Sequence, residues 1–138
     1  VALVEKRLIK LKDIKKDVLM PSFVGNKNAK TILISWGSNK LIVQEAVEKM
    51  IAEGYKVAAL HFAQVYPLTE KMIAKYNLCQ KKQVITIENN ATGQFAQLLK
   101  SDLGVEVTDT ILKYNGECFT VEELCLSIKK LLRKKNGK

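Results

Sequence analysis

Three short apolar runs, separated by segments with helical periodicity, constrain the fold of this 138-residue chain more than any other feature. The runs are Thr31–Trp36, Val57–Phe62 and Val84–Ile87. Continuous apolar strands of this length are typical of a parallel sheet that is buried on both faces. Parallel strands need long connections, and the intervening helices of 10–15 residues supply them. The pattern therefore predicts an α/β fold with a mostly parallel sheet of four to five strands.

Turn and capping residues predict the helices of this fold. Gly54 and Gly104 end two amphipathic segments, and Thr120 with Glu123 three residues later forms a capping box for a last helix. Apolar residues at spacings of three and four predict a helix at the N-terminus. We expect helices over about 4–18, 40–54, 69–77 and 92–103, and from about 120 onward.

Two further segments have strand-like patterns. Residues 105–112 alternate apolar and polar side chains, which fits a half-exposed edge strand. Residues 19–24 form either a short fifth strand or the start of a loop over 21–30, because Pro21 disfavours a strand interior.

The sequence predicts one α/β domain preceded by a connecting segment. Residues 1–30 are expected to form an N-terminal helix and linker that leads in from a missing upstream domain. Residues 31–138 are expected to form a single domain that ends in a basic helix. Because the helical pattern starts at the first residue, Val1, we expect the chain to be a piece of a longer protein.

The net charge of +9 lies at the two ends of the chain. Residues 1–30 carry a net charge of +5 and residues 129–138 carry +6, whereas residues 31–128 carry −2. The basic segments lack the interleaved aromatic residues that stack on bases. A solvated helix face or tail is therefore favoured over an arm that binds nucleic acid or an acidic partner.

Composition also argues against several other classes of protein. No apolar run approaches the roughly 20 residues of a membrane-spanning helix, and no signal peptide is recognisable. The three cysteines, Cys79, Cys118 and Cys125, are scattered and form no Cys-x-x-Cys pair, which favours a reducing cytoplasm over a metal site. His61 is the only histidine.

Polar residues follow three of the predicted strands, at the edge of the sheet where α/β proteins usually place their sites. They occupy residues 35–38, 61–64 and 88–90, and the helix that starts near Thr92 offers free amides for an anion. No glycine-rich phosphate-binding motif is present. The candidate residues for an interface or an anion site are Trp36, Gly37, Ser38, Glu88, Asn89, Asn90, Thr92, Gly93 and Gln94.

The residue types favour structural over catalytic roles at this edge. Glu88 is expected to cap a helix or accept hydrogen bonds at an interface rather than act as a general base. His61 is expected to be a hydrogen-bonded histidine, since nothing in the sequence shows that it reaches Ser35 or Ser38. Trp36 is assigned to packing in the core or at an interface.

Several segments together resemble one family of enzymes. They are Val4–Leu8, Ile34–Ser38, Tyr66–Leu68, Glu88–Gln94 and Tyr114–Gly116, in that order. The chain resembles the C-terminal domain of the alpha subunit of 2-oxoacid:ferredoxin oxidoreductases, most closely the 2-oxoglutarate type. The resemblance implies a transketolase C-terminal-like fold, a three-layer α/β/α sandwich.

The resemblance also implies a function for the parent enzyme. Such an enzyme decarboxylates a 2-oxoacid such as 2-oxoglutarate or pyruvate on thiamine diphosphate with magnesium. It reduces ferredoxin through iron–sulfur clusters and releases CO₂ and an acyl-coenzyme A. An upstream pyrimidine-binding domain and a beta subunit would hold the cofactors, so no catalytic, cofactor-binding or metal residue is expected here. Residues 36–38 and 88–94 would help to assemble the enzyme, and the fragment alone would be inactive.

Two alternatives remain open from the sequence. The edge could bind coenzyme A or another anion at the helix start near Thr92, with help from terminal lysines. The basic ends could instead make a nucleic-acid-binding module. The identity of the 2-oxoacid and any homo-oligomeric state are not determined by these residues.

Overall fold

A computed structural model describes residues 2–81 and 83–136 of the chain and shows a five-stranded sheet in the order β1-β3-β2-β4-β5. Strands β2, β3, β4 and β5 are parallel, and β1 pairs with β3 in the antiparallel sense. The strands are β1 (Ser22–Gly25), β2 (Thr31–Trp36), β3 (Val57–Phe62), β4 (Gln83–Glu88) and β5 (Asp109–Leu112).

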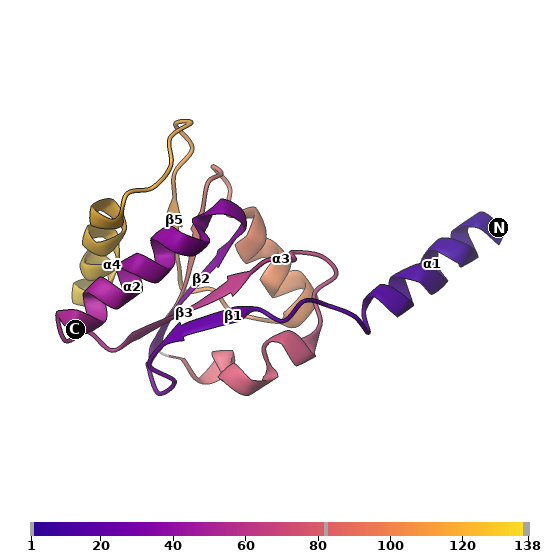
Figure 1. The fold of residues 1–138 in the computed structure, drawn as a ribbon, viewed down its shortest axis with the longest axis horizontal. Coiled ribbons are helices and arrows are strands. Elements are labelled where there is room, and N and C mark those ends of the chain that lie inside the picture. Colours follow the sequence, from indigo (N-terminus) through magenta and orange to yellow (C-terminus); the bar gives the residue numbers. More distant parts are fainter. Residues whose placement is uncertain (1, 82, 137–138) are drawn as a thin grey trace.

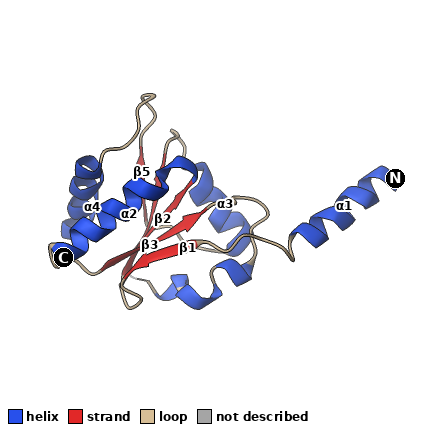
Figure 2. Ribbon diagram, in the orientation of Figure 1, coloured by secondary structure: helices blue, strands red, loops and turns tan. Residues whose placement is uncertain are grey.

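Helices cover both faces of this sheet (Figure 1). Helices α2 (Lys40–Ala52) and α4 (Val121–Asn136) lie on one face. Helix α3 (Gln94–Leu103) lies on the other face with three 3-10 turns, η2 (Glu70–Met72), η3 (Ala74–Tyr76) and η4 (Leu78–Gln80). Figure 2 shows these helical layers on either side of the strands, so the predicted three-layer α/β/α sandwich is confirmed.

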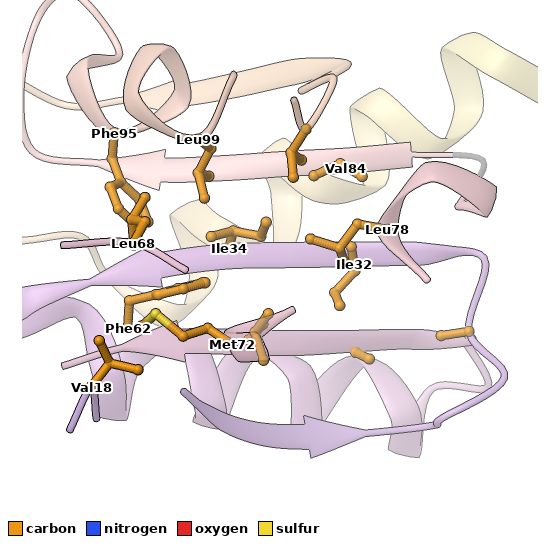
Figure 3. Packing of buried hydrophobic residues seen from close by; sticks show 14 residues of the cluster. Val18, Ile32, Ile34, Phe62, Leu68, Met72, Leu78, Val84, Phe95 and Leu99 are labelled. Carbon is orange, nitrogen blue, oxygen red and sulfur yellow. The ribbon is translucent and has the colours of Figure 1, made fainter. Parts of the chain in front are cut away.

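The two helical layers bury two separate hydrophobic clusters against the central strands. Ile32 and Ile34 of β2 face the α3 side, where they pack with Phe95 and Leu99 (Figure 3). Leu33, between them, faces the α2 and α4 side. Because successive residues of a strand point to opposite faces, a strand buried on both sides is expected to be apolar at most positions. This explains why the three apolar runs identify the sheet.

The structure differs from the sequence-based expectations at five elements. The N-terminal helix, expected over about 4–18, spans Ala2–Ile14. Residues 22–25 form the fifth strand rather than part of a loop, directly after Pro21. The expected helix over 69–77 is a series of 3-10 turns, interrupted where Asn77 adopts a left-handed conformation. Strand β5 is shorter than predicted, because only residues 109–112 pair with β4. Helix α3 begins at Gln94, two residues later than expected.

The N-terminal helix α1 (Ala2–Ile14) projects away from the sheet (Figure 1). None of its residues is buried, and Leu3, Val4, Leu8 and Ile9 are exposed. The chain joins the packed domain at Val18, which is buried in the cluster on the α3 side. Among the described helices, none combines the length and apolar character that a bilayer crossing requires.

Gly25, at the end of β1, permits a close approach to β3. It has a φ of +106°, and a Cβ atom there would lie 2.7 Å from the carbonyl oxygen of Val57 and 2.8 Å from the Cα of Ala58. We expect Gly25→Ala to lower the free energy of unfolding by about 3 kcal/mol, through strain at positive φ and steric overlap with β3. Urea denaturation followed by circular dichroism measures this loss.

Gly54→Ala is the matched control. Gly54 has a φ of +90°, but a Cβ atom there would meet nothing within 4 Å. This variant should lose only about 1 kcal/mol, from backbone strain alone. Equal losses in the two variants would contradict the proposed steric role of Gly25.

Candidate functional site at the carboxyl edge of the sheet

The predicted site residues converge at the carboxyl edge of the parallel strands. The register pairs Ser35 of β2 with His61 of β3 on one side and with Ile87 of β4 on the other. Residues that follow these strands therefore emerge close together. In Figure 1 the loops after β4 and β5 project beyond this edge of the sheet.

Glu88, the last residue of β4, caps helix α3 from inside the protein. Its side chain is 0% exposed, and its carboxylate accepts hydrogen bonds from the backbone N–H of Phe95 at 2.8 Å and of Ala96 at 3.0 Å. The side-chain amide of Asn90 donates a third hydrogen bond to it at 2.8 Å. A negative charge at a helix N-terminus also interacts favourably with the helix dipole. The helix-capping role predicted for Glu88 is confirmed.

Asn90 caps the turn that precedes the helix. Its Oδ1 accepts hydrogen bonds from the backbone N–H of Thr92 at 3.1 Å, Gly93 at 2.7 Å and Gln94 at 3.3 Å. Gly93 is the N-cap residue and has a left-handed conformation, with φ 64°. Together with Glu88, Asn90 occupies five consecutive amides. The free amides expected near Thr92 for an anion are therefore not available, because acceptors within the chain already bind them.

Ser38 and Asn89 line one hollow of this edge, on the side of the β5–α4 loop. The hollow measures about 420 Å³, and its other lining residues are Lys113, Tyr114, Gly116, Glu117 and Cys118. Ser38 belongs to the short turn after Gly37, which has a φ of 64°. The side chains of Ser38 and Asn89 are exposed. The residues after β5 were not among the predicted site residues, although residues 114–116 belong to the segments that carry the family resemblance.

The lysine in this hollow is already paired within the chain. Lys113 Nζ lies 2.9 Å from a Glu123 carboxylate oxygen and 3.6 Å from Glu117, and it donates to the carbonyl oxygen of Cys118 at 2.9 Å. The hydrogen bond to Glu123 raises the pKa of the Lys113 ammonium. Lys113 therefore holds the β5–α4 loop against the start of α4 and does not present an unpaired charge.

Trp36 and Gln94 line a second, mainly apolar hollow on the α3 side of the edge. It measures about 180 Å³ and also includes Val65, Phe95 and Leu98. The Trp36 and Phe95 rings lie 6.2 Å apart between centroids. The indole Nε1 of Trp36 is buried and has no hydrogen-bond partner among the described residues. Burial of an unpaired N–H costs free energy, so this group is an unsatisfied polar atom within the edge.

The structure reveals one side-chain pair that sequence analysis did not predict. Ser35 Oγ and His61 Nδ1 lie 2.9 Å apart and share a hydrogen bond between β2 and β3. Ser35 is 0% exposed and His61 is 7% exposed. Burial lowers the pKa of the His61 imidazole, and the Lys40 ammonium lowers it further. Because Ser35 is enclosed, the pair joins two strands rather than presenting a nucleophile to a substrate.

The described residues do not provide a metal or cluster site. No group of three or more His, Cys, Asp or Glu side chains within them is arranged to hold a metal ion. Cys79 and Cys118 are exposed in separate segments, and Cys125 is buried in α4. An iron–sulfur cluster requires several cysteine ligands around one centre, and these cysteines do not supply them.

Comparison with known proteins identifies related sequences. The family model described as pyruvate:ferredoxin oxidoreductase core domain II matches residues 29–124. The 2-oxoacid:ferredoxin oxidoreductase subunit alpha of Saccharolobus solfataricus is 33% identical over 133 residues. That match covers 94% of this chain and 21% of the relative. The chain thus spans about a fifth of the length of the curated relatives it matches.

Solved structures share the fold. The alpha chain of a probable 2-oxoacid ferredoxin oxidoreductase from Thermoplasma acidophilum has 31% identity and a TM-score of 0.57, covering 83% of this chain and 97% of that chain. A 2-oxoglutarate:ferredoxin oxidoreductase from Magnetococcus marinus has 24% identity and a TM-score of 0.81, covering 94% and 22%. A Pichia stipitis transketolase has 13% identity and a TM-score of 0.62, covering 86% and 18%. The last two likenesses concern the fold alone, and they confirm the expected transketolase C-terminal-like architecture.

The buried cap predicts a large effect of removing the Glu88 carboxylate. We expect Glu88→Ala to lower the free energy of unfolding by about 3 kcal/mol, because two helix amides lose their acceptor inside the protein. Amide hydrogen exchange at Phe95 and Ala96 should accelerate with it. Glu106→Ala is the control, since this exposed residue forms a surface ion pair with Lys100, and its loss should stay within about 0.5 kcal/mol. Similar losses in both variants would refute the capping role.

The lowered pKa of His61 predicts a dependence of stability on pH. The unfolded chain binds a proton at His61 below about pH 6.5, whereas the folded chain resists protonation until lower pH. The free energy of unfolding should therefore fall as the pH decreases from 7 towards 5. Denaturation at several pH values measures this slope. His61→Asn should have a shallower slope in this range, and an unchanged slope would exclude His61 as its source.

Proposed function

The chain belongs to the pyruvate:ferredoxin oxidoreductase core domain II family, and on this premise we propose that it is a non-catalytic assembly domain of an alpha subunit. The parent enzyme would be a thiamine diphosphate-dependent 2-oxoacid:ferredoxin oxidoreductase of the 2-oxoglutarate or pyruvate type. It would convert the 2-oxoacid to an acyl-coenzyme A and CO₂ and would reduce ferredoxin. The domain's own role would be to dock on the rest of this enzyme through its carboxyl edge.

The hydrogen bonds that Glu88 accepts within the chain are the main support for a non-catalytic role. An acid at the end of a parallel strand is well placed for catalysis, but this carboxylate is fully buried and already accepts three hydrogen bonds. Asn90 is committed to backbone amides in the same way. A general base must reach the proton that it removes, and Glu88 does not reach the surface. The polar residues thus support the shape of the edge.

The surface that remains at this edge favours contact with protein. Tyr66 and Tyr114, in the loops after β3 and β5, have exposed side chains. Aromatic residues are enriched at protein interfaces because they bury a large area at a low cost in conformational entropy. Trp36 and Ser38 line hollows beside them, which a neighbouring domain could fill. The nine predicted residues, which are residues 36–38, 88–90 and 92–94, remain proposed as the part of the edge that shapes this interface.

The cofactors of the proposed enzyme would be held outside this chain. The separated cysteines do not suit a cluster, and the occupied amides at the start of α3 do not suit a phosphate group. Thiamine diphosphate, magnesium, iron–sulfur clusters and the substrate coenzyme A would therefore belong to other domains or subunits. The related enzyme from Magnetococcus marinus has been solved with 2-oxoglutarate, coenzyme A and succinyl-CoA bound.

The proposed partners follow from this assignment. They are an upstream pyrimidine-binding domain, a beta subunit and, through the whole enzyme, ferredoxin, with a second copy of the subunit as a further candidate. The lead-in expected over residues 1–30 would be the part before Val18, because Val18 and strand β1 (Ser22–Gly25) pack with the docking domain expected over residues 31–138. All three cysteines are free of disulfide bonds, which fits the cytoplasm as the proposed compartment.

Exposed residues at the edge can test the docking role. Tyr114 is 70% exposed, and Tyr114→Asp should lower co-purification of this chain with the remaining subunits by about tenfold, because a charge would be buried at the interface. Ferredoxin reduction by the reconstituted enzyme should fall in parallel. Leu126→Asp is the control, since Leu126 is 69% exposed on α4. Equal effects of the two changes would contradict docking through the carboxyl edge.

Omission of the domain tests the proposal as a whole. The isolated chain should not oxidise 2-oxoacids, and the remaining subunits should lose activity without it. An assembly that lacks this domain and still reduces ferredoxin at the full rate would refute the assembly role.

A further inference from the structure

A group of lysines surrounds an aromatic wall at the end of the sheet opposite the carboxyl edge. A cavity of about 270 Å³ lies there, beside β1, the start of β2 and the turns η3 and η4. Its lining residues are Phe23, Lys27, Ile32, Lys75, Tyr76 and Lys81. None of these belongs to the assembly edge, so a function of this cavity would be additional to the proposed one.

This cavity adjoins a second cavity that is also lined by lysines. A neighbouring cavity of about 250 Å³ shares Lys27 and Lys81 and adds Lys30 to its lining. No described residue that lines either cavity is acidic. Among the ion pairs of residues 2–81 and 83–136, none involves these four lysines. Like charges held together without counter-ions repel one another, and a bound anion would relieve this repulsion.

The shape of the lysine cluster is held by hydrogen bonds. Lys81 Nζ donates to the carbonyl oxygen of Ala29 at 2.9 Å and lies 3.5 Å from that of Lys27. Asn26 Oδ1 accepts from the backbone N–H of Asn28 at 2.8 Å, which stabilises the turn between β1 and β2. Lys81 thus connects this turn to the chain just before β4. The turn and the Lys81 side chain are thus held in place before any ligand arrives, which lowers the entropic cost of binding.

The aromatic wall gives the cavity a second recognition element. The Phe23 and Tyr76 rings are stacked, with centroids 5.3 Å apart and planes at 16°. Lys75 Nζ lies 5.1 Å from the centre of the Tyr76 ring. A planar ligand group could pack against this apolar wall while its charged part lies among the lysines.

We propose that this cavity binds a nucleotide, with the base against the Phe23–Tyr76 wall and the phosphates near Lys27, Lys30 and Lys75. Inorganic phosphate would leave the aromatic wall unused, and an uncharged nucleoside would leave the lysines unneutralised. Each of the two adjoining volumes is slightly smaller than a usual small-ligand site, and only together do they reach that size. The absence of a glycine-rich loop is consistent with phosphates held by side chains rather than by backbone amides.

Calorimetric titration of the 138-residue chain with ADP at low ionic strength tests the proposal. ADP should bind more tightly than pyrophosphate, and adenosine should bind least, because only ADP uses both parts of the site. The double change Lys27→Ala with Lys75→Ala should weaken ADP binding by about tenfold, and added salt should weaken it in the unchanged chain. Lys130→Ala, on α4, should leave the affinity unchanged.

The aromatic wall is tested by changes at Tyr76. Tyr76→Leu should weaken ADP binding by about tenfold without affecting pyrophosphate, whereas Tyr76→Phe should retain the affinity. Circular dichroism establishes that each variant is folded. Absence of ADP binding at millimolar concentration would overturn the proposal. Equal affinities for ADP and pyrophosphate, or equal losses in the Lys130→Ala and double-lysine variants, would overturn it too. None of these results depends on assembly of the oxidoreductase.

Discussion

The buried carboxylate of Glu88 connects the central sheet to helix α3, and the arrangement of the carboxyl edge depends on it. It stands at the end of β4, where a polar side chain without partners would be costly to bury. The first amides of α3 lack acceptors within the helix, and Glu88 supplies them at Phe95 and Ala96. The carboxylate and the helix amides thus satisfy each other's hydrogen bonds. Asn90 binds the amides of the preceding turn in the same way. The polar residues after β4, which most resemble an active site by sequence, therefore have a structural role: they connect the strand to the helix.

The electrostatics of the molecule show a similar contrast between composition and arrangement. By sequence, the positive charge lies at the two ends, and residues 31–128 are slightly acidic. In the folded chain, Lys27 and Lys30 from one turn meet Lys75 and Lys81 from another segment. The cluster is therefore positive although most of the domain around it is not. Lys113, by comparison, is neutralised by Glu117 and Glu123 and serves to hold a loop.

Elements with local signals could be predicted from the sequence, whereas those with distant partners could not. Strands β2, β3 and β4 were predicted because both of their faces are buried, and the Thr120–Glu123 capping box is present as expected. Strand β1 was left open, since two of its four residues are exposed and its hydrogen bonds come from β3, more than 30 residues away. The prediction of a helix over 69–77 was wrong. This segment forms short 3-10 turns, whose apolar side chains pack against the sheet.

The sequence by itself determined the α/β architecture, the capping signals and the family resemblance, because periodicity and short motifs are properties of neighbouring residues. Only the tertiary structure decided which polar groups are free to act. It buried Glu88, paired Ser35 with His61 across two strands, and brought three lysines to one aromatic wall. Burial and pairing arise from contacts between residues distant in the chain, and a pattern of residue types does not specify them.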